Sequence, residues 1–215
     1  MEKQDILNIL KQQYRTYINF DTSTSETDKQ LIYITMGAIN PDFYKAFLAA
    51  PAGKMKHGGF PGGLEKHCDY MYTYLLHWKA KHPDSELTEF DCAVIAYLHD
   101  LCKVRLYERR PDGTYTYAKG QSFERHAVES VRIIEEELKL PLSPLQRSCI
   151  LLHMSSWSTS EDILAISSRD KEWLNNLNHI PILQAVNWAD MKAYMIEAFE
   201  ERVAAATEIL NKEIT

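Results

Sequence analysis

The segment from about 88 to 103 constrains the fold most, because the helix predicted there is apolar on almost every side. It carries the run AVIAYL at 93–98. Thr88 and Asp91 form a capping box at its start, in which Asp takes the usual place of Glu or Gln. A helix that is apolar all round is buried on all sides. We therefore expect this helix at the centre of a helical bundle.

Apolar residues recur at helical spacing along most of the remaining chain. A polar segment at 21–27 and a glycine-rich segment at 51–63 are predicted loops, and residues 155–179 are expected to be irregular or shortly helical. The other predicted helices are 3–19, 27–38, a short one opening at Pro41, one from about 64, 123–138, one opening at Ser143-Pro144 with Gln146 completing a capping box, 180–196 and 198–212.

One segment departs from this helical periodicity. Tyr107 on one side and Tyr115 and Tyr117 on the other flank the turn sequence Pro-Asp-Gly at 111–113. Apolar and aromatic residues around such a turn are typical of a β-hairpin. The predicted fold class is therefore all-α, a helical bundle with a small β-hairpin insertion at about 104–118.

Composition limits the classes of function. The chain has 215 residues, of which 45 % are hydrophobic and 25 % charged, as in folded globular proteins. No run approaches the roughly 20 apolar residues of a membrane helix, and the charged N-terminus lacks a signal-peptide core, so we expect a cytoplasmic protein that does not enter membranes. A net charge of −6 argues against binding long duplex nucleic acid. The four cysteines form no CxxC pair and are expected to pack in the core as reduced thiols.

Six residues of metal-ligating type fall within predicted helices. Any one histidine on an apolar face is more often a hydrogen-bonded core residue than a ligand. A buried carboxylate is rarer, because it is costly to bury without a partner. Taken together, these imidazoles and carboxylates all need partners, and a metal ion such as Fe, Mn, Co, Ni or Zn supplies a common one. The six are His67, His99, Asp100, His126, His153 and Asp190.

The short sequence motifs that contain these residues make the prediction of a metal site more specific. Gly62-Gly63-Leu64 precedes His67, the doublet His99-Asp100 is followed by Lys103, and two later histidines and a distal aspartate follow in order. The whole set resembles the HD-domain superfamily of metal-dependent phosphohydrolases, over about residues 57–195. The predicted layout is one HD-type domain over 1–215, with the HD core at 57–195 and a C-terminal helix at 198–215. Residues 1–50 would form N-terminal helices covering the core; the alternative is that they mediate dimerisation.

The resemblance also implies two divalent transition-metal ions, because the second pair of histidines is typical of binuclear members. Asp100 would bridge the ions and act in catalysis together with Lys103. Lys103 lies one helical turn beyond Asp100, where its charge would meet a substrate phosphate; the alternative is a cation favoured by the helix dipole. The implied ligands are His67, His99, Asp100 and Asp190 for one ion, and His126 and His153, with Asp100 shared, for the other.

Basic residues gather near this region although the chain is acidic. Residues 103–120 hold five basic side chains and two acidic ones. We expect Lys103, His57, Arg125 and Lys119 to contact substrate. The alternatives are an ordinary loop position for His57 and a solvent-facing one for Arg125.

The expected reaction is hydrolysis of a phosphoester or phosphoanhydride, in which a hydroxide bridging the two ions attacks phosphorus in line. By family analogy the substrate is a nucleotide, a dinucleotide or a short oligonucleotide. Two alternatives stay open. One is a di-iron HD-type oxygenase acting on a small phosphonate or polyol; the other is an HD domain that binds a nucleotide without turning it over.

Overall fold

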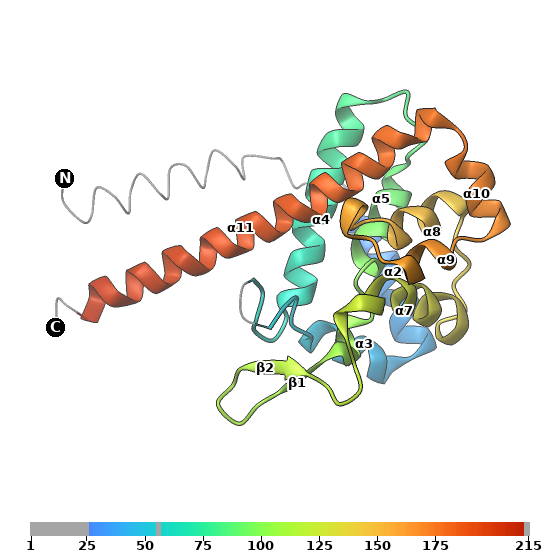
Figure 1. Cartoon of the computed structure of the whole chain (residues 1–215). Helices are drawn as coiled ribbons and strands as arrows, with labels where there is room; N and C mark the ends of the chain where they lie inside the picture. Colours follow the sequence, from blue (N-terminus) through green and yellow to red (C-terminus); the bar gives the residue numbers. More distant parts are fainter. Residues whose placement is uncertain (1–25, 55–56, 213–215) are drawn as a thin grey trace.

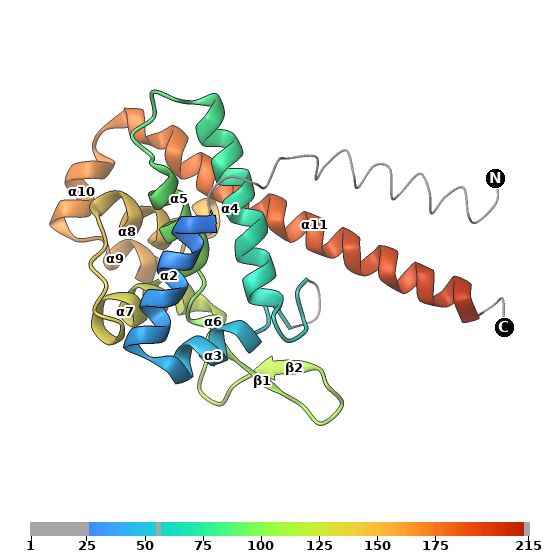
Figure 2. The same cartoon turned by 180° about the vertical axis from the view of Figure 1, so that it is seen from behind.

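The computed structural model describes residues 26–54 and 57–212 (Figures 1 and 2). The fold is all-α with one two-stranded antiparallel hairpin, as predicted. In chain order the elements are α2 (Glu26–Ile39), α3 (Pro41–Ala49), α4 (Gly63–Lys81), α5 (Glu89–Leu98), α6 (Lys103–Leu106), β1 (Tyr107–Arg109), β2 (Tyr115–Tyr117), the 3-10 turn η1 (Phe123–Arg125), α7 (His126–Arg132), the π-helical turn η2 (Ile133–Glu137), α8 (Pro144–Leu151), η3 (Ser155–Trp157), α9 (Ser160–Leu164), α10 (Ser168–Leu174), η4 (Leu177–His179) and α11 (Ile180–Lys212).

Helix α5 lies at the centre of the bundle, as its composition predicts. Every residue from 92 to 98 is buried, and α2, α4 and α8 pack around it. Full burial of each large apolar side chain here contributes about 1.5–3 kcal/mol. The capping box of Thr88 and Asp91 begins the helix, as expected. The Ser143 and Gln146 box likewise begins α8.

The end of the central helix is a correction. The helix predicted over 88–103 stops at Leu98, and the chain passes through a tight turn at 99–102 before α6. At this point the Ala96 carbonyl, which a continuing helix would use, accepts a hydrogen bond from His99 Nδ1 at 3.0 Å. Since 103–106 is helical, the hairpin is shorter than predicted and pairs Tyr107 with Tyr117.

Helix α11 is a second correction. The predicted pair 180–196 and 198–212 is one continuous helix that packs along α4 and then extends beyond the other helices (Figure 1). No glycine or proline lies between residues 182 and 212, so nothing in the backbone ends the helix near Glu197. The helix predicted over 123–138 is instead divided into η1, α7 and η2.

The glycine-rich loop folds tightly against the start of α4. The Ala52 amide donates to the Gly58 carbonyl at 2.9 Å, and the Leu64 amide donates to the Ala50 carbonyl at 3.0 Å. Gly63 lies so close to this loop that a Cβ atom there would lie 2.0 Å from the Gly58 carbonyl oxygen. The loop thereby brings His57 next to α4.

Some predictions concern residues outside those described, namely the helix at 3–19 and the ends of the expected domain layout. That layout and the cytoplasmic location stay predictions. Among the described helices, none is both long and apolar enough to cross a bilayer. The four cysteines are buried free thiols, as expected.

Candidate metal centre

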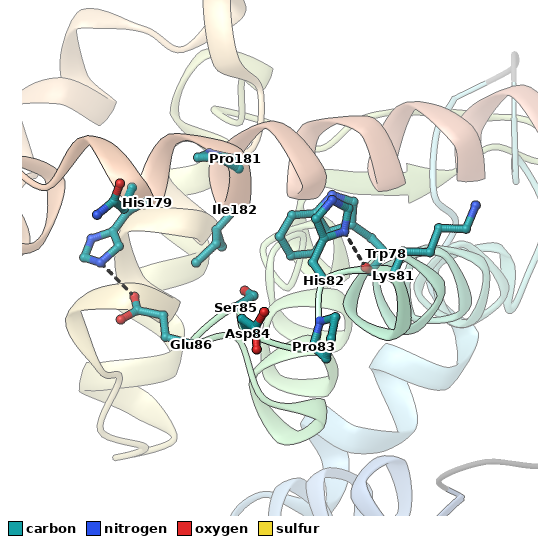
Figure 3. A pocket seen from close by; sticks show the side chains of 11 residues that line it. Trp78, Lys81, His82, Pro83, Asp84, Ser85, Glu86, His179, Pro181 and Ile182 are labelled. Atoms are coloured by element: carbon teal, nitrogen blue, oxygen red, sulfur yellow. Dashed lines mark hydrogen bonds and ion pairs between the residues drawn. The ribbon is translucent and has the colours of Figure 1, made fainter.

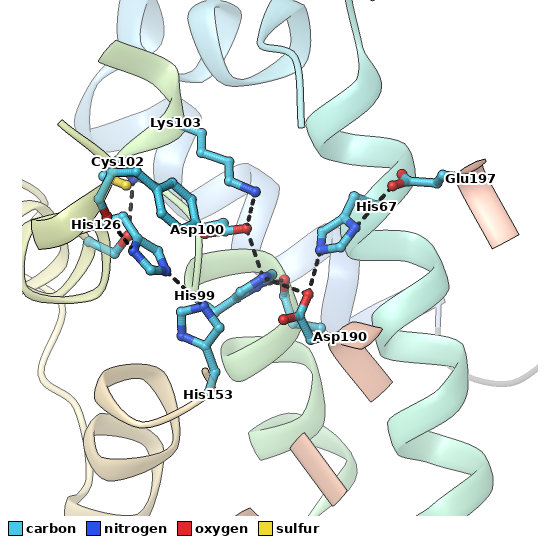
Figure 4. A network of polar contacts seen from close by, with 12 residues as sticks. His67, His99, Asp100, Cys102, Lys103, His126, His153, Asp190 and Glu197 are labelled. Carbon is cyan, nitrogen blue, oxygen red and sulfur yellow. Dashed lines mark hydrogen bonds and ion pairs between the residues drawn. The ribbon is translucent and has the colours of Figure 1, made fainter. Parts of the chain in front are cut away.

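The six predicted ligands converge on one buried site, although they come from five separate parts of the chain (Figure 4). Asp190 is the least covered, with a side chain 13 % exposed. The contributing segments are α4 with His67, the turn after α5 with His99 and Asp100, the start of α7 with His126, the turn after α8 with His153, and α11 with Asp190.

Two groups of three side chains within this site could each hold a metal ion. The first is His67, His99 and Asp190, in which Asp190 Oδ1 lies 3.0 Å from His67 Nε2 and 3.9 Å from His99 Nε2. The second is His99, Asp100 and His153. In each group the candidate ligand atoms lie within 4.8 Å of one another. His99 is common to both groups, whereas the resemblance implies Asp100 as the shared ligand.

Three of the four histidines are oriented in the same way. Each uses its Nδ1 atom to bond the backbone carbonyl three residues earlier, which requires a proton on Nδ1 and leaves a lone pair on Nε2. The bonds are His99 to Ala96 at 3.0 Å, His126 to Phe123 at 2.8 Å and His153 to Ile150 at 2.7 Å.

The resulting lone pairs need a cation. His126 Nε2 and His153 Nε2 face each other at 3.1 Å, as two acceptors without a proton to share. His99 Nε2 lies 3.1 Å from Asp100 Oδ2 without a well-directed hydrogen bond, and within the described part of the chain Asp100 Oδ1 is also buried without a partner. Each unsatisfied buried group costs about 1–3 kcal/mol. Imidazole and carboxylate donors in this state fit a divalent transition metal.

His67 carries the strongest electrostatic signature of the site. Burial disfavours its charged form, but hydrogen bonds to Asp190 and Glu197 outweigh burial and raise the pKa of His67 to about 10. Burial likewise opposes ionisation of Asp190, but the bond from His67 holds the Asp190 pKa below its ordinary value. Without a metal, a proton on His67 therefore balances these carboxylates at neutral pH.

His126 and His153 favour the neutral form, because burial lowers the pKa of both imidazoles. Burial, reinforced by the neighbouring His99 and His126, lowers the pKa of His153 to about 3. Burial of Asp100 opposes its ionisation, but Lys103 and then His99 hold its pKa well below the usual range. Neutral imidazoles and ionised carboxylates are the forms that bind metal ions.

Lys103 lies inside the cluster, as predicted. Its Nζ atom is 2.5 Å from Asp100 Oδ2, and the residue is 5 % exposed. Burial alone would lower the Lys103 pKa, but the Asp100 carboxylate outweighs it and raises that pKa. Lys103 is thus a fixed positive charge beside the candidate ligands.

The structure places the other predicted substrate residues differently. His57 lies at the edge of the cluster, with its ring centroid 6.0 Å from that of His67 and 4.5 Å from that of Tyr194. Arg125 forms a mostly exposed ion pair with Glu161 at 2.6 Å. Lys119 is exposed on the loop after β2. Only His57 is brought to the metal cluster, and the substrate roles of all three stay predictions.

Glu197 is a site residue that the sequence reasoning missed. Its side chain is 2 % exposed, and its Oε2 atom lies 3.2 Å from His67 Nδ1. Glu197 follows Asp190 by seven residues, or about two helical turns, so both lie on one face of α11. The predicted helix break at this position concealed that spacing.

A hollow of about 470 Å³ lies elsewhere, between the end of α4 and the start of α11 (Figure 3). Two histidines border it: His82 Nδ1 bonds the Trp78 carbonyl at 2.8 Å, and His179 Nε2 lies 3.3 Å from Glu86 Oε1. None of the predicted site residues lines this hollow. It is therefore separate from the metal cluster.

The comparisons with known proteins agree with this geometry. The HD domain matches residues 64–195, more than half of the chain and a span that includes all six predicted ligands. No curated protein and no solved structure matches the chain significantly. HD domains bind divalent metals and are mostly metal-dependent phosphohydrolases. The chain belongs to the HD-domain family.

Proposed function

We propose that this protein is a two-metal phosphohydrolase that cleaves a phosphoester or phosphoanhydride bond of a nucleotide, a dinucleotide or a short oligonucleotide. The observation that carries the proposal is the pair of imidazole nitrogens of His126 and His153, which face each other as acceptors beside the unpartnered atoms of His99 and Asp100. One ion would be held by His67, His99, Asp190 and Asp100, with Asp100 shared between the two ions. The other would be held by Asp100, His126 and His153.

Divalent ions in such a site lower the pKa of water and offset charge on phosphoryl oxygens. The chain's own residues supply the rest. Asp100 Oδ2 holds the Lys103 Nζ atom at 2.5 Å, beside the candidate metal ligands. The positive charge of Lys103 would there stabilise a phosphoryl group bound at the cluster. Burial, and then the charge of Lys103, lowers the pKa of His57 to about 3, so this imidazole is neutral at pH 7 and would act as a hydrogen-bonding group for substrate at the edge of the site.

The test compares Asp100→Ala with His77→Ala in purified protein supplied with Mn²⁺, Co²⁺ or Ni²⁺. Substrates are bis(p-nitrophenyl) phosphate and a panel of nucleotides, dinucleotides and short oligonucleotides. Asp100→Ala should lower kcat by about 10³-fold or more, since it removes a ligand and the partner of Lys103. His77→Ala should stay near wild type, because His77 is ten residues beyond His67 on α4, or about 15 Å along the helix.

Equal losses in both variants, or an active Asp100→Ala protein, would contradict the proposal. Iron content with substrate-dependent O₂ consumption would instead identify the oxygenase. Nucleotide that is bound but stays intact with every metal would identify a binding domain.

A further inference from the structure

His67 is held differently from the other three histidines of the cluster. Those three bond backbone carbonyls of their own segments, whereas His67 Nδ1 bonds the Glu197 carboxylate from another helix. His67 lies inside α4, where backbone carbonyls accept the helical amides of residues further along. Its Nδ1 atom therefore depends on a tertiary partner.

Helix α11 contacts both nitrogens of this imidazole. Asp190 Oδ1 lies 3.0 Å from Nε2 and Glu197 Oε2 lies 3.2 Å from Nδ1 (Figure 4). The ring is thus fixed between two carboxylates on one helix face. With Glu197 on Nδ1, the Nε2 atom is the one that points into the cluster.

Glu197 is a buried carboxylate that is only partly paired within the described residues. The residue is 2 % exposed, and among the described residues its second oxygen, Oε1, has no hydrogen-bond partner. A buried carboxylate that is only partly paired is costly, and an apolar side chain of similar size would serve packing better. Its contact with His67 is the interaction that accounts for a carboxylate at this position.

We infer that Glu197 is a positioning residue, which orients His67 and strengthens it as a ligand for the ion held with His99 and Asp190. This inference rests on the proposed function. A carboxylate on the far nitrogen of a ligating histidine fixes its tautomer and raises its basicity, and loss of such a partner typically weakens metal binding 10–100-fold. Glu197 would therefore strengthen metal binding at the position that includes His67, and not at the one that includes His126 and His153.

The experiment titrates metal-free protein with Co²⁺ alone, following its visible absorption and the bound equivalents. The variants are Glu197→Leu and Glu197→Gln. Glu200→Gln is the matched control, because Glu200 lies on the same helix and bonds Tyr70 and Lys66 instead of His67. Thermal unfolding of each metal-free variant measures folding independently of the metal.

We expect metal-free Glu197→Leu to fold and to unfold cooperatively, and to bind one of its two Co²⁺ ions about 10–100-fold more weakly than wild type. Glu197→Gln, whose amide oxygen still accepts from Nδ1, should recover part of that affinity, and Glu200→Gln should bind like wild type. The ion that is lost should be the one that a His126→Ala variant keeps.

Wild-type Co²⁺ affinity in folded Glu197→Leu would overturn the inference. So would failure of both Glu197 variants to fold, because Glu197 would then be a structural residue. If wild type itself binds no Co²⁺, the proposed function fails, a result distinct from one in which only the Glu197 variants behave like wild type.

Discussion

The charge on His67 links the metal site to the stability of the metal-free protein. An imidazole in an unfolded chain has a pKa of about 6.5, whereas the folded value is about 10. The raised pKa stabilises the folded state fully below pH 6.5, and this stabilisation is lost as the pH rises toward 10. Metal binding requires a deprotonated imidazole, so this pH dependence of stability is expected for the protein without metal.

We therefore predict that the chelated protein becomes less stable between pH 7 and pH 9, with His67 contributing roughly 2 kcal/mol of the decrease. Urea unfolding at both pH values measures it. In His67→Gln, which does not titrate, the decrease should be smaller by about that amount. An identical decrease in the two proteins would show that His67 is not charged in the metal-free fold.

At the scale of single residues, the sequence predicted the candidate ligands but not the residue that positions one of them. The six residues that meet in the cluster could be named from the order of the Gly-Gly-Leu motif, the His-Asp doublet and the later histidines. Glu197 lies in no such motif. Its role depends on the packing of α11 against α4, which joins residues 130 positions apart.

At the scale of elements, the contact between the glycine-rich loop and α4 positions His57 and His67 together. Gly63 is required because the loop carbonyl of Gly58 occupies the space of a side chain. Gly120 provides a contrast: its φ is +79°, and a Cβ atom added there would meet no atom of the described residues within 4 Å. The first glycine is needed for close approach, the second only for its backbone conformation.

Gly63→Ala should therefore destabilise the protein by about 3 kcal/mol, since backbone must move to admit the methyl group. Gly120→Ala should cost about 1 kcal/mol, the usual penalty of a left-handed residue. Urea unfolding of the two variants against wild type measures both. Equal losses would mean that the loop yields freely and does not fix the start of α4.

Helix starts were predictable and helix ends less so. The capping boxes that begin α5 and α8 each span four consecutive residues, so the local sequence determines them. Helix α5 ends where His99 Nδ1 bonds the Ala96 carbonyl. This bond orients the His99 side chain in the metal cluster, so the end of the helix is tied to the site. The continuity of α11 follows from uninterrupted helix formers and packing on α4, which outweigh any local change in pattern at residue 197.

For the whole molecule, the central feature is that α5 is buried from Cys92 to Leu98 and ends at the metal cluster. The helices around it bring His67, His126, His153 and Asp190 to the His-Asp doublet at its end. Periodicity predicted the central helix and the all-α class, but only the resemblance to a family connected residues so distant in sequence. Arg125 pairs with Glu161 at the surface, and its contact with substrate stays a prediction.

The most direct test of the central claim is the metal content of the whole protein, purified without chelator and measured by plasma mass spectrometry. The buried donors of the cluster predict close to two equivalents of Fe, Mn, Ni, Co or Zn per chain, and clearly fewer in Asp100→Ala. A protein that carries no metal, and takes up none when these ions are supplied, would contradict the metal centre and the hydrolase proposed from it.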